Sequence, residues 1–348
     1  MAEFITELVE ESEEKVRERI LANLVSELKI SAKQVRTTVG LLDEGNTIPF
    51  IARYRKEMTG ELDETQIRAI EERLQYLRNL EARKNEVLRL IFEQGKLTEE
   101  LRQAIASSAK LQEVEDLYRP YRQKRKTRAS VAKEKGLEPL ADWIFSQPRS
   151  GELLAEAEKY VNPEKAVATA EEAIQGALDI IAENIADDAS IRTWVRKFTY
   201  DHGVIITEAK DPEAESVYEM YYAYQEPVRK LPPHRILAIN RGEREEMLKV
   251  RLEVDEARIH ESIARKLLKS ESVTRQVLLG AIEDSYNRLI APSIEREVRG
   301  ELTEKAEEHA IKVFADNLRN LLLQPPVKGY VVLGVDPAYR TGCKLAVV

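Results

Sequence analysis

The chain has 348 residues and a formal net charge of −8 at pH 7, and a third of its residues are charged. This composition is typical of a soluble, folded, mainly helical protein and excludes a disordered or collagen-like chain. The only cysteine is Cys343, which excludes an intrachain disulfide, and we see neither a signal peptide nor a run of about twenty apolar residues. We therefore expect a cytoplasmic protein that does not cross a membrane.

Residues 1–62 are predicted to form a small helical domain. Apolar residues recur at helical spacing from the start of the chain, and a capped helix is expected between Ser31 and Gly45. Another helix is expected to begin after Thr47 and to end at Gly60. We expect it to bury four large side chains, those of Phe50, Ile51, Tyr54 and Met58.

These two short helices, joined by a glycine turn, also suggest a helix-turn-helix-like element. In that interpretation Arg53 and Lys56 lie one helical turn apart and face a nucleic-acid backbone, with Arg55 beside them. The alternative is a small helical bundle in which Ile51 and Tyr54 pack inside and the cations lie on the surface without a function. The pattern leaves both interpretations open.

Residues 63–210 are predicted to contain one long helix, a helical bundle and a basic segment. Asp63 and the glutamine three residues later have the spacing of a capping box, and apolar residues then follow at three-four spacing. This pattern predicts a helix over 64–94. Glu81 and Lys84 interrupt the apolar row, which argues against a long symmetric coiled-coil dimer and favours a monomer.

The basic segment, residues 118–135, carries eight Lys or Arg residues against only Glu134, in a chain that is acidic overall. Such a local excess attracts an anionic partner, and tyrosines among arginines can stack on unpaired bases. Pro120 predicts an exposed turn. The segment therefore predicts non-specific contacts to RNA or DNA; the alternative is a loop that forms salt bridges with acidic neighbours. The candidate residues are Tyr118, Arg119, Tyr121, Arg122, Lys124, Arg125, Lys126 and Arg128.

A second helical region is predicted over 211–326. Before it, Thr169 is expected to cap a helix, and residues 204–206 suggest a short strand. Residues 235–240 and 247–254 are two apolar-rich runs that predict a small β-hairpin. Four tyrosines precede these runs, and we expect them to pack rather than to stack on bases. They are Tyr218, Tyr221, Tyr222 and Tyr224.

Residues 327–348 differ from the rest because two apolar strands, 330–336 and 343–348, predict a hairpin. A two-stranded hairpin is only marginally stable alone, so we expect it to open a domain that continues outside this chain. Asp336 ends the first strand and is the one weak catalytic candidate. The histidines lack metal-site spacing and no phosphate loop is visible, so we expect no metal, no cofactor and no enzyme activity.

Four sequence blocks together resemble the bacterial transcription accessory proteins of the Tex family. They are NTIPFIARYRKE from Asn46, LYRPYR from Leu117, HRILAINRGE from His234 and LGVDP from Leu333. The resemblance implies a cytosolic protein with a helical N-terminal region, a YqgF or RNase H-like domain, helix-hairpin-helix motifs and a C-terminal OB-fold RNA-binding domain. The present chain would then hold the helical region and the first hairpin of a truncated RNase H-like domain.

Three functions remain open from the sequence. The first is the helical scaffold of a transcription accessory factor that binds RNA or DNA non-specifically and acts with the transcription machinery. The second is a protein-interaction scaffold without nucleic-acid binding of its own. The third is the remnant of an RNase H-like nuclease, in which Asp336 would need carboxylates from other strands to hold two metal ions.

Overall fold

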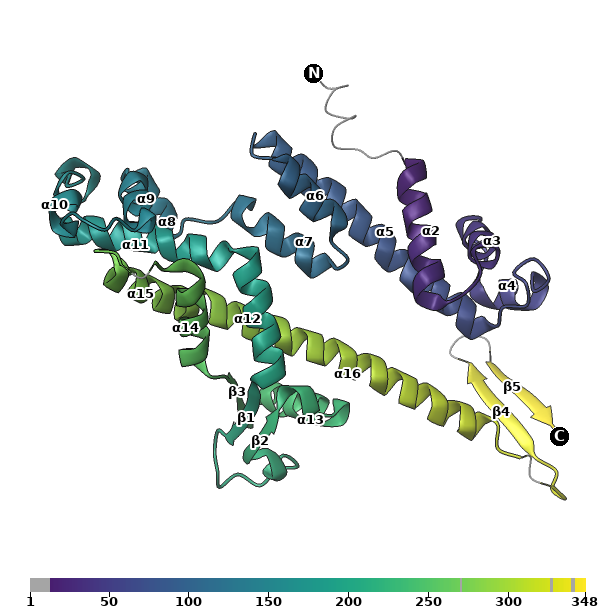
Figure 1. Cartoon of the computed structure of the whole chain (residues 1–348). Coiled ribbons are helices and arrows are strands. Elements are labelled where there is room, and N and C mark those ends of the chain that lie inside the picture. The colour runs from purple at the N-terminus through teal and green to yellow at the C-terminus, as the bar shows by residue number, and fades with distance from the viewer. Residues whose placement is uncertain (1–12, 270, 326–327, 339–341) are drawn as a thin grey trace. The chain divides into compact units, whose positions relative to one another are not determined.

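The computed structural model describes residues 13–269, 271–325, 328–338 and 342–348. This part is mainly helical, as the composition and periodicity predict, and it also contains a three-stranded and a two-stranded antiparallel sheet (Figure 1). The chain divides into two compact units. The first comprises the chain up to Phe198 with Asp255–Ile294, and the second comprises Thr199–Val254 with Glu295–Val348.

The first unit begins with three helices that pack on the N-terminal half of a long helix. These are α2 (Glu13–Leu28), α3 (Ala32–Asp43) and α4 (Ile48–Tyr54), and the long helix is α5 (Glu64–Glu93). Capping boxes at Ser31 and Asp63 begin α3 and α5, because in each the side chain and the glutamine three residues later bond each other's backbone N–H. The predicted helix over 64–94 is confirmed. Residues 1–12 of the predicted N-terminal helix lie outside the described residues.

Helix α4 is shorter than the sequence predicts, and two of its expected core residues are exposed. It ends at Tyr54, whose side chain is 62% exposed, and Met58 is 54% exposed. The chain turns after Arg55, and Thr59 is fully buried while its hydroxyl donates to the Lys56 carbonyl at 3.0 Å. The inward position that the helical spacing assigns to Met58 is therefore taken by Thr59, and the prediction that Tyr54 and Met58 are buried is wrong.

The C-terminal half of α5 packs with α6 (Glu99–Ser107) and α7 (Leu111–Tyr118) around a second hydrophobic cluster. Near the start of this second cluster on α5, Glu81 and Lys84 are buried. Lys84 Nζ donates to Glu81 Oε1 at 3.0 Å and to the Ala106 carbonyl at 2.9 Å, and Arg19 of α2 also donates to Glu81. The polar interruption in the apolar row is thus a buried, paired ion cluster within one chain.

The remainder of the first unit packs around α11 (Ala170–Asp187), which Thr169 caps as predicted. Its partners include α8, α9, α10 and α15, and glycine at position 176 permits the close approach of Leu137. The helices that complete this part of the chain are α8 (Arg128–Glu134), α9 (Glu138–Ser146), α10 (Leu153–Glu158), α12 (Ala189–His202), α14 (Glu256–Leu267), α15 (Arg275–Asp284), the π-helical turn Ser285–Ile290 and α16 (Ala291–Leu322). Of these, α12 and α16 contribute residues to both units.

The second unit contains a sheet with strand order β2-β1-β3. Its strands are β1 (Val204–Ala209), β2 (Ala223–Pro227) and β3 (Leu248–Glu253). The predicted hairpin of 235–240 with 247–254 is wrong, because Pro233–Arg244 forms helix α13 and β3 pairs with β1 instead. Proline in the first turn starts α13, and Ile236 and Ile239 form its buried face.

The tyrosines before α13 do not lie on one helix: Tyr221 is in the 3₁₀ turn Glu219–Tyr221, Tyr218 and Tyr222 flank that turn, and Tyr224 is in β2. Tyr218 and Tyr221 are buried, and the Tyr221 and Tyr224 rings meet edge to face at 5.3 Å, so the predicted packing role is confirmed for them. The terminal strands β4 (Leu333–Ala338) and β5 (Gly342–Val347) form the predicted antiparallel hairpin. None of the helices in the described ranges is both long and apolar enough to cross a bilayer.

Candidate nucleic-acid interface

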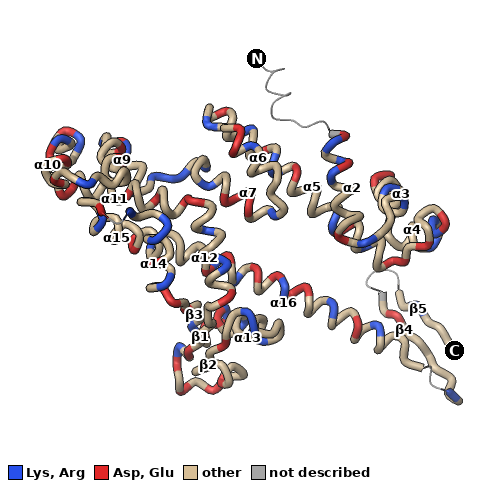
Figure 2. The backbone as a smooth tube through the Cα atoms, in the orientation of Figure 1, with Lys and Arg blue, Asp and Glu red and all other residues tan. Residues whose placement is uncertain are grey.

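The basic segment runs from the end of α7 through α8, and its residues 122–127 form irregular backbone between the two helices. A single 3₁₀ turn covers Arg119–Tyr121, and α8 begins when the Thr127 hydroxyl accepts the backbone N–H of Ser130 at 3.0 Å. Figure 2 shows the resulting run of Lys and Arg between the two helices. The residues between this turn and α8 form no helix or strand. Their side chains therefore do not share one helical face, and each points in its own direction.

Tyrosine 118, the first candidate, is part of the core. Tyr118 is 7% exposed, belongs to the second hydrophobic cluster and lies under the Arg83 guanidinium, 5.4 Å from its ring centroid. Tyr121 is half-buried, and its carbonyl accepts the Gln94 side-chain amide at 2.9 Å. These contacts fix the start of the segment, and the Tyr118 ring has no open face for a base.

Two of the candidate cations are bound to the acidic end of α11. Arg119 Nε lies 3.2 Å from Asp187 Oδ1, and Lys124 Nζ lies 3.4 Å from Glu183 Oε1 and also bonds Asp187. Burial raises the pKa of Asp187, although Lys124 and Arg119 oppose that shift. For Arg119 and Lys124 the structure therefore shows the salt-bridged alternative.

Three cations remain directed at solvent: Arg122, Arg125 and Lys126, which we call the basic triplet. All three are exposed, and no carboxylate of the described residues lies within ion-pair distance of them. Arg128 is also exposed, but its charge acts on Asp179 of α11. The triplet is therefore the part of the segment that is available to an anionic partner.

The second predicted group lies at the end of α4. Arg53, Arg55 and Lys56 are exposed, and none of them forms an ion pair with a described carboxylate. Lys56 lies beyond the end of the helix, and the Arg55 guanidinium covers the Phe50 ring at 5.3 Å. Tyr54, which the sequence pattern places inside, is exposed beside Phe50, with ring centroids 5.3 Å apart. No hydrogen bond or ion pair among the described residues joins this group to the basic triplet.

Asp336 lies on β4 opposite Lys344 of β5 and is exposed. Within the described ranges, no three His, Cys, Asp or Glu residues are grouped so that they could hold a metal ion.

Two family models match the chain. Residues 18–92 match the Tex-like protein N-terminal domain, and residues 149–314 match the Tex central region-like model. The chain belongs to the Tex family. Among curated relatives, it is 56% identical to the uncharacterized protein YdcI of Bacillus subtilis over 93% of this chain and 46% of that protein.

Other relatives of this Tex-family chain are named as Tex or for an RNA-binding domain. It is 42% identical to Protein tex of Bordetella pertussis over 95% of the chain and 44% of that protein. It is 31% identical to S1 RNA-binding domain-containing protein 1 of Homo sapiens over 89% of the chain and 32% of that protein. The chain thus spans less than half the length of these relatives.

The two cationic groups differ in their place relative to the family models. The group at the end of α4 lies inside the Tex N-terminal match, whereas the basic triplet lies between the two matches.

Proposed function

We propose that this Tex-family chain is a helical scaffold that holds RNA or DNA by non-specific phosphate contacts, and that it does so in a transcription accessory role. The observation that carries the proposal is the basic triplet. Arg122, Arg125 and Lys126 are exposed and have no carboxylate partner among the described residues, although many other arginines of the first unit are paired. Unpaired cations keep their full attraction for phosphate, because no internal ion pair has to be broken first.

The names of relatives support the same role. One relative is called transcriptional accessory protein Tex in Neisseria gonorrhoeae, and another is called S1 RNA-binding domain-containing protein 1 in Pongo abelii. In our proposal the chain acts as a monomer in the cytoplasm, beside the transcription machinery. The α3–α4 region supplies a helix-turn-helix-like element, and the β4–β5 hairpin belongs to an RNase H-like domain without catalytic use of Asp336.

The test uses fluorescence anisotropy of labelled single-stranded RNA and duplex DNA. We expect the variant R122E/R125E/K126E to bind at least about tenfold more weakly at low salt, a loss of about 1.4 kcal/mol or more. Lys124 is left unchanged because a glutamate there would face Glu183 and Asp187. Since the triplet has no described partner in the fold, the variant should unfold at the same temperature as the parent.

The matched control is K15E/K33E/K96E, which changes the net charge equally at three exposed lysines elsewhere in the first unit. Its binding should weaken much less. Equal losses in both variants would mean that net charge alone matters, and an unchanged affinity of the triplet variant would leave the protein-interaction scaffold as the better function. A separate variant, R53E/R55E/K56E, measures what the helix-turn-helix-like element adds.

A further inference from the structure

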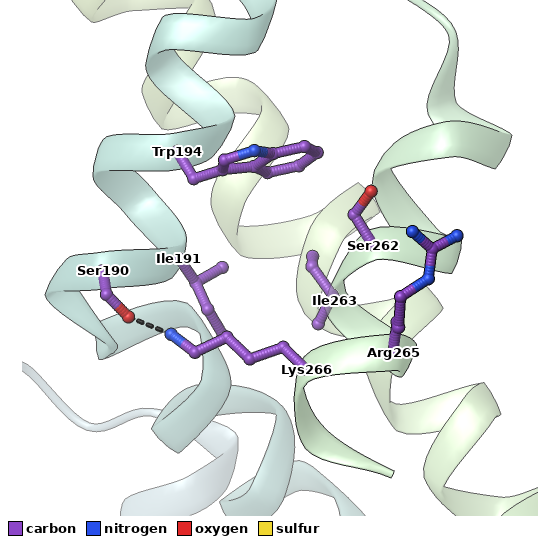
Figure 3. Close-up of a pocket in the computed structure, with 7 residues that line it drawn as sticks. All are labelled: Ser190, Ile191, Trp194, Ser262, Ile263, Arg265 and Lys266. Carbon is purple, nitrogen blue, oxygen red and sulfur yellow. Dashed lines mark hydrogen bonds between the residues drawn. The ribbon is translucent and has the colours of Figure 1, made fainter.

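A pocket of about 500 Å³ lies between α12 and α14 of the first unit. Ser190, Ile191 and Trp194 line it from α12, where their spacing puts them on one helical face; Ser262, Ile263, Arg265 and Lys266 line it from α14. In Figure 3 the indole of Trp194 forms one end, the two isoleucines lie in the middle, and the hydrogen-bonded pair of Ser190 and Lys266 lies at the other end. The volume falls in the range of about 300–1,000 Å³ that is usual for small-molecule sites.

The apolar part of the pocket has the character of a stacking surface. Trp194 is 39% exposed, and its ring is supported by Phe198, with centroids 5.2 Å apart and planes inclined by 20°. Phe198 in turn is covered by the Arg258 guanidinium at 5.2 Å. A held but accessible indole offers a rigid aromatic face at little entropic cost, which suits a planar aromatic group.

The charged part of the pocket is cationic, and its existing pairs are weak. Lys266 bonds Ser190 and lies 3.4 Å from Asp188 Oδ1, and Arg265 lies 2.7 Å from Glu261 Oε1. All four charged side chains are at least one-third exposed, and ion pairs of that kind contribute at most about 1 kcal/mol. A phosphate can therefore displace Asp188 from Lys266, whereas the Arg265 guanidinium lies on the opposite side of the pocket in Figure 3 and is not part of the phosphate site.

We propose that this pocket binds a nucleotide, with the base against Trp194, Ile191 and Ile263 and the phosphate at Lys266. The ligand chemistry is a planar base that carries a phosphate. It has two sources, a free mononucleotide or an unpaired nucleotide of a single strand. The proposal goes beyond the phosphate contacts of the basic triplet, because it adds a site that reads the base.

The experiment uses the emission of Trp194. The chain contains two tryptophans, so Trp143→Phe leaves Trp194 as the only one. We titrate this variant with adenosine monophosphate, uridine monophosphate and a short single-stranded RNA, and with adenosine and inorganic phosphate separately. The expected result is saturable quenching by the nucleotides, with adenosine and phosphate at least about tenfold weaker, because each makes only part of the contacts.

Two further variants locate the signal. Lys266→Met in the same background should weaken nucleotide binding several-fold, whereas Lys96→Met, far from the pocket in sequence and outside its lining, should not. Quenching by mononucleotides should persist when the basic triplet is reversed, so failure of the triplet proposal does not affect this result. Equal affinities for mononucleotide and RNA indicate a free nucleotide, and binding of RNA alone indicates a strand.

Three results would overturn the proposal. They are the absence of quenching by any nucleotide at millimolar concentration, equal quenching by inorganic phosphate alone, and unchanged affinity in Lys266→Met. Circular dichroism of each variant checks that the helices remain folded. We expect no loss of helix, since the Lys266 side chain is exposed and contributes little to the core.

Discussion

Arg192 has no exposed surface, and its guanidinium forms an ion pair and a hydrogen bond with buried groups. Its Nε lies 3.3 Å from Asp116 Oδ1, and its Nη2 donates to Ser293 Oγ at 2.9 Å. Asp116, which is also buried, accepts two more hydrogen bonds from Arg196 at 2.8 and 2.9 Å. A buried charge is tolerated only when it is paired in this way, and Asp116 of α7 supplies that pairing to two arginines of α12.

Replacing Asp116 with asparagine should therefore destabilise the chain strongly. The change removes the negative charge that Asp116 presents to Arg192 and Arg196, and breaking a buried pair typically costs about 3–5 kcal/mol. Urea unfolding followed by circular dichroism measures the loss. Glu18→Gln is the control, because Glu18 pairs with Arg36 on the surface and should contribute less than about 1 kcal/mol. Similar losses in the two variants would contradict this account of Asp116.

A second residue-scale prediction concerns alkaline pH. Burial and the hydrogen bond to Glu226 raise the pKa of Tyr224 from 10.0 to about 12, although Arg235 opposes the shift. Because the folded state favours the neutral phenol, this stabilisation is complete below pH 10.0 and is lost as the pH rises toward about 12.

Ultraviolet difference titration of tyrosinate measures this shift. Glu226→Gln removes the neighbouring negative charge, so one tyrosine should ionise at a lower pH in the variant than in the parent. The prediction fails if the two titration curves coincide.

At the scale of elements, α11 packs unusually closely against its neighbours at Gly176. A Cβ atom at Gly176 would lie 2.4 Å from Leu137 Cδ1 and 3.4 Å from Ala132 Cβ. Leu137 is itself 1% exposed and therefore enclosed by the packed core, where a shift of its side chain disturbs its neighbours. The absence of a side chain at Gly176 is therefore what allows α11 to pack against α8 and the turn before α9.

Gly176→Ala should destabilise the chain by about 1–2 kcal/mol, because the steric overlap outweighs the gain in helix propensity of about 1 kcal/mol. Gly40→Ala in α3 is the matched comparison. No atom lies within 4 Å of a Cβ placed there, so only the propensity gain applies and the chain should become more stable. Thermal unfolding of the two variants should shift in opposite directions, and a shift of both to higher temperature would refute the packing argument.

Helix starts could be predicted from the sequence because their signals are local. The capping residues Ser31, Asp63 and Thr169 act on backbone groups three residues away, and each is found where the pattern places it. Helix α13 was not predictable from its apolar run, since the four consecutive apolar residues 236–239 fit a buried strand as well as a helix. Its state depends on burial of Ile236 and Ile239 within its unit, and the proline at its start was the overlooked signal.

The candidate interface shows the same limit. Charge density identified the basic segment, but the partners of Arg119 and Lys124 lie about sixty residues later, on α11. Tyr118 is removed from the surface by a hydrophobic cluster assembled from α5, α6 and α7. Such contacts between distant parts of the chain decide which of several similar residues stay exposed, and no local spacing encodes them.

On the scale of the whole molecule, a basic triplet acts within a chain of net charge −8. At physiological salt the Debye length is about 8 Å, so distant acidic residues are screened while direct phosphate contacts are less so. The salt dependence of the binding constant should therefore be that of three phosphate contacts, although the net charge of the chain is negative.

We expect the logarithm of the binding constant to fall with the logarithm of salt concentration with a slope of about 2 for single-stranded RNA and about 3 for duplex DNA. These values follow from three neutralised phosphates. Anisotropy titrations at a series of potassium chloride concentrations give the slope, and in R122E/R125E/K126E it should approach zero. A steep slope that survives in that variant would assign binding to other cations.

Helix α5 belongs to both hydrophobic clusters of the first unit. Ile67 to Leu77 pack into one and Leu80 to Ile91 into the other, with Tyr76 touching both and the charged Glu81 and Lys84 close to the junction. Amide hydrogen exchange follows the opening of whichever packed region protects each N–H. The two halves of one uninterrupted helix of 30 residues can therefore exchange at different rates, so isotope labelling along α5 alone would report the separate opening free energies of two cores.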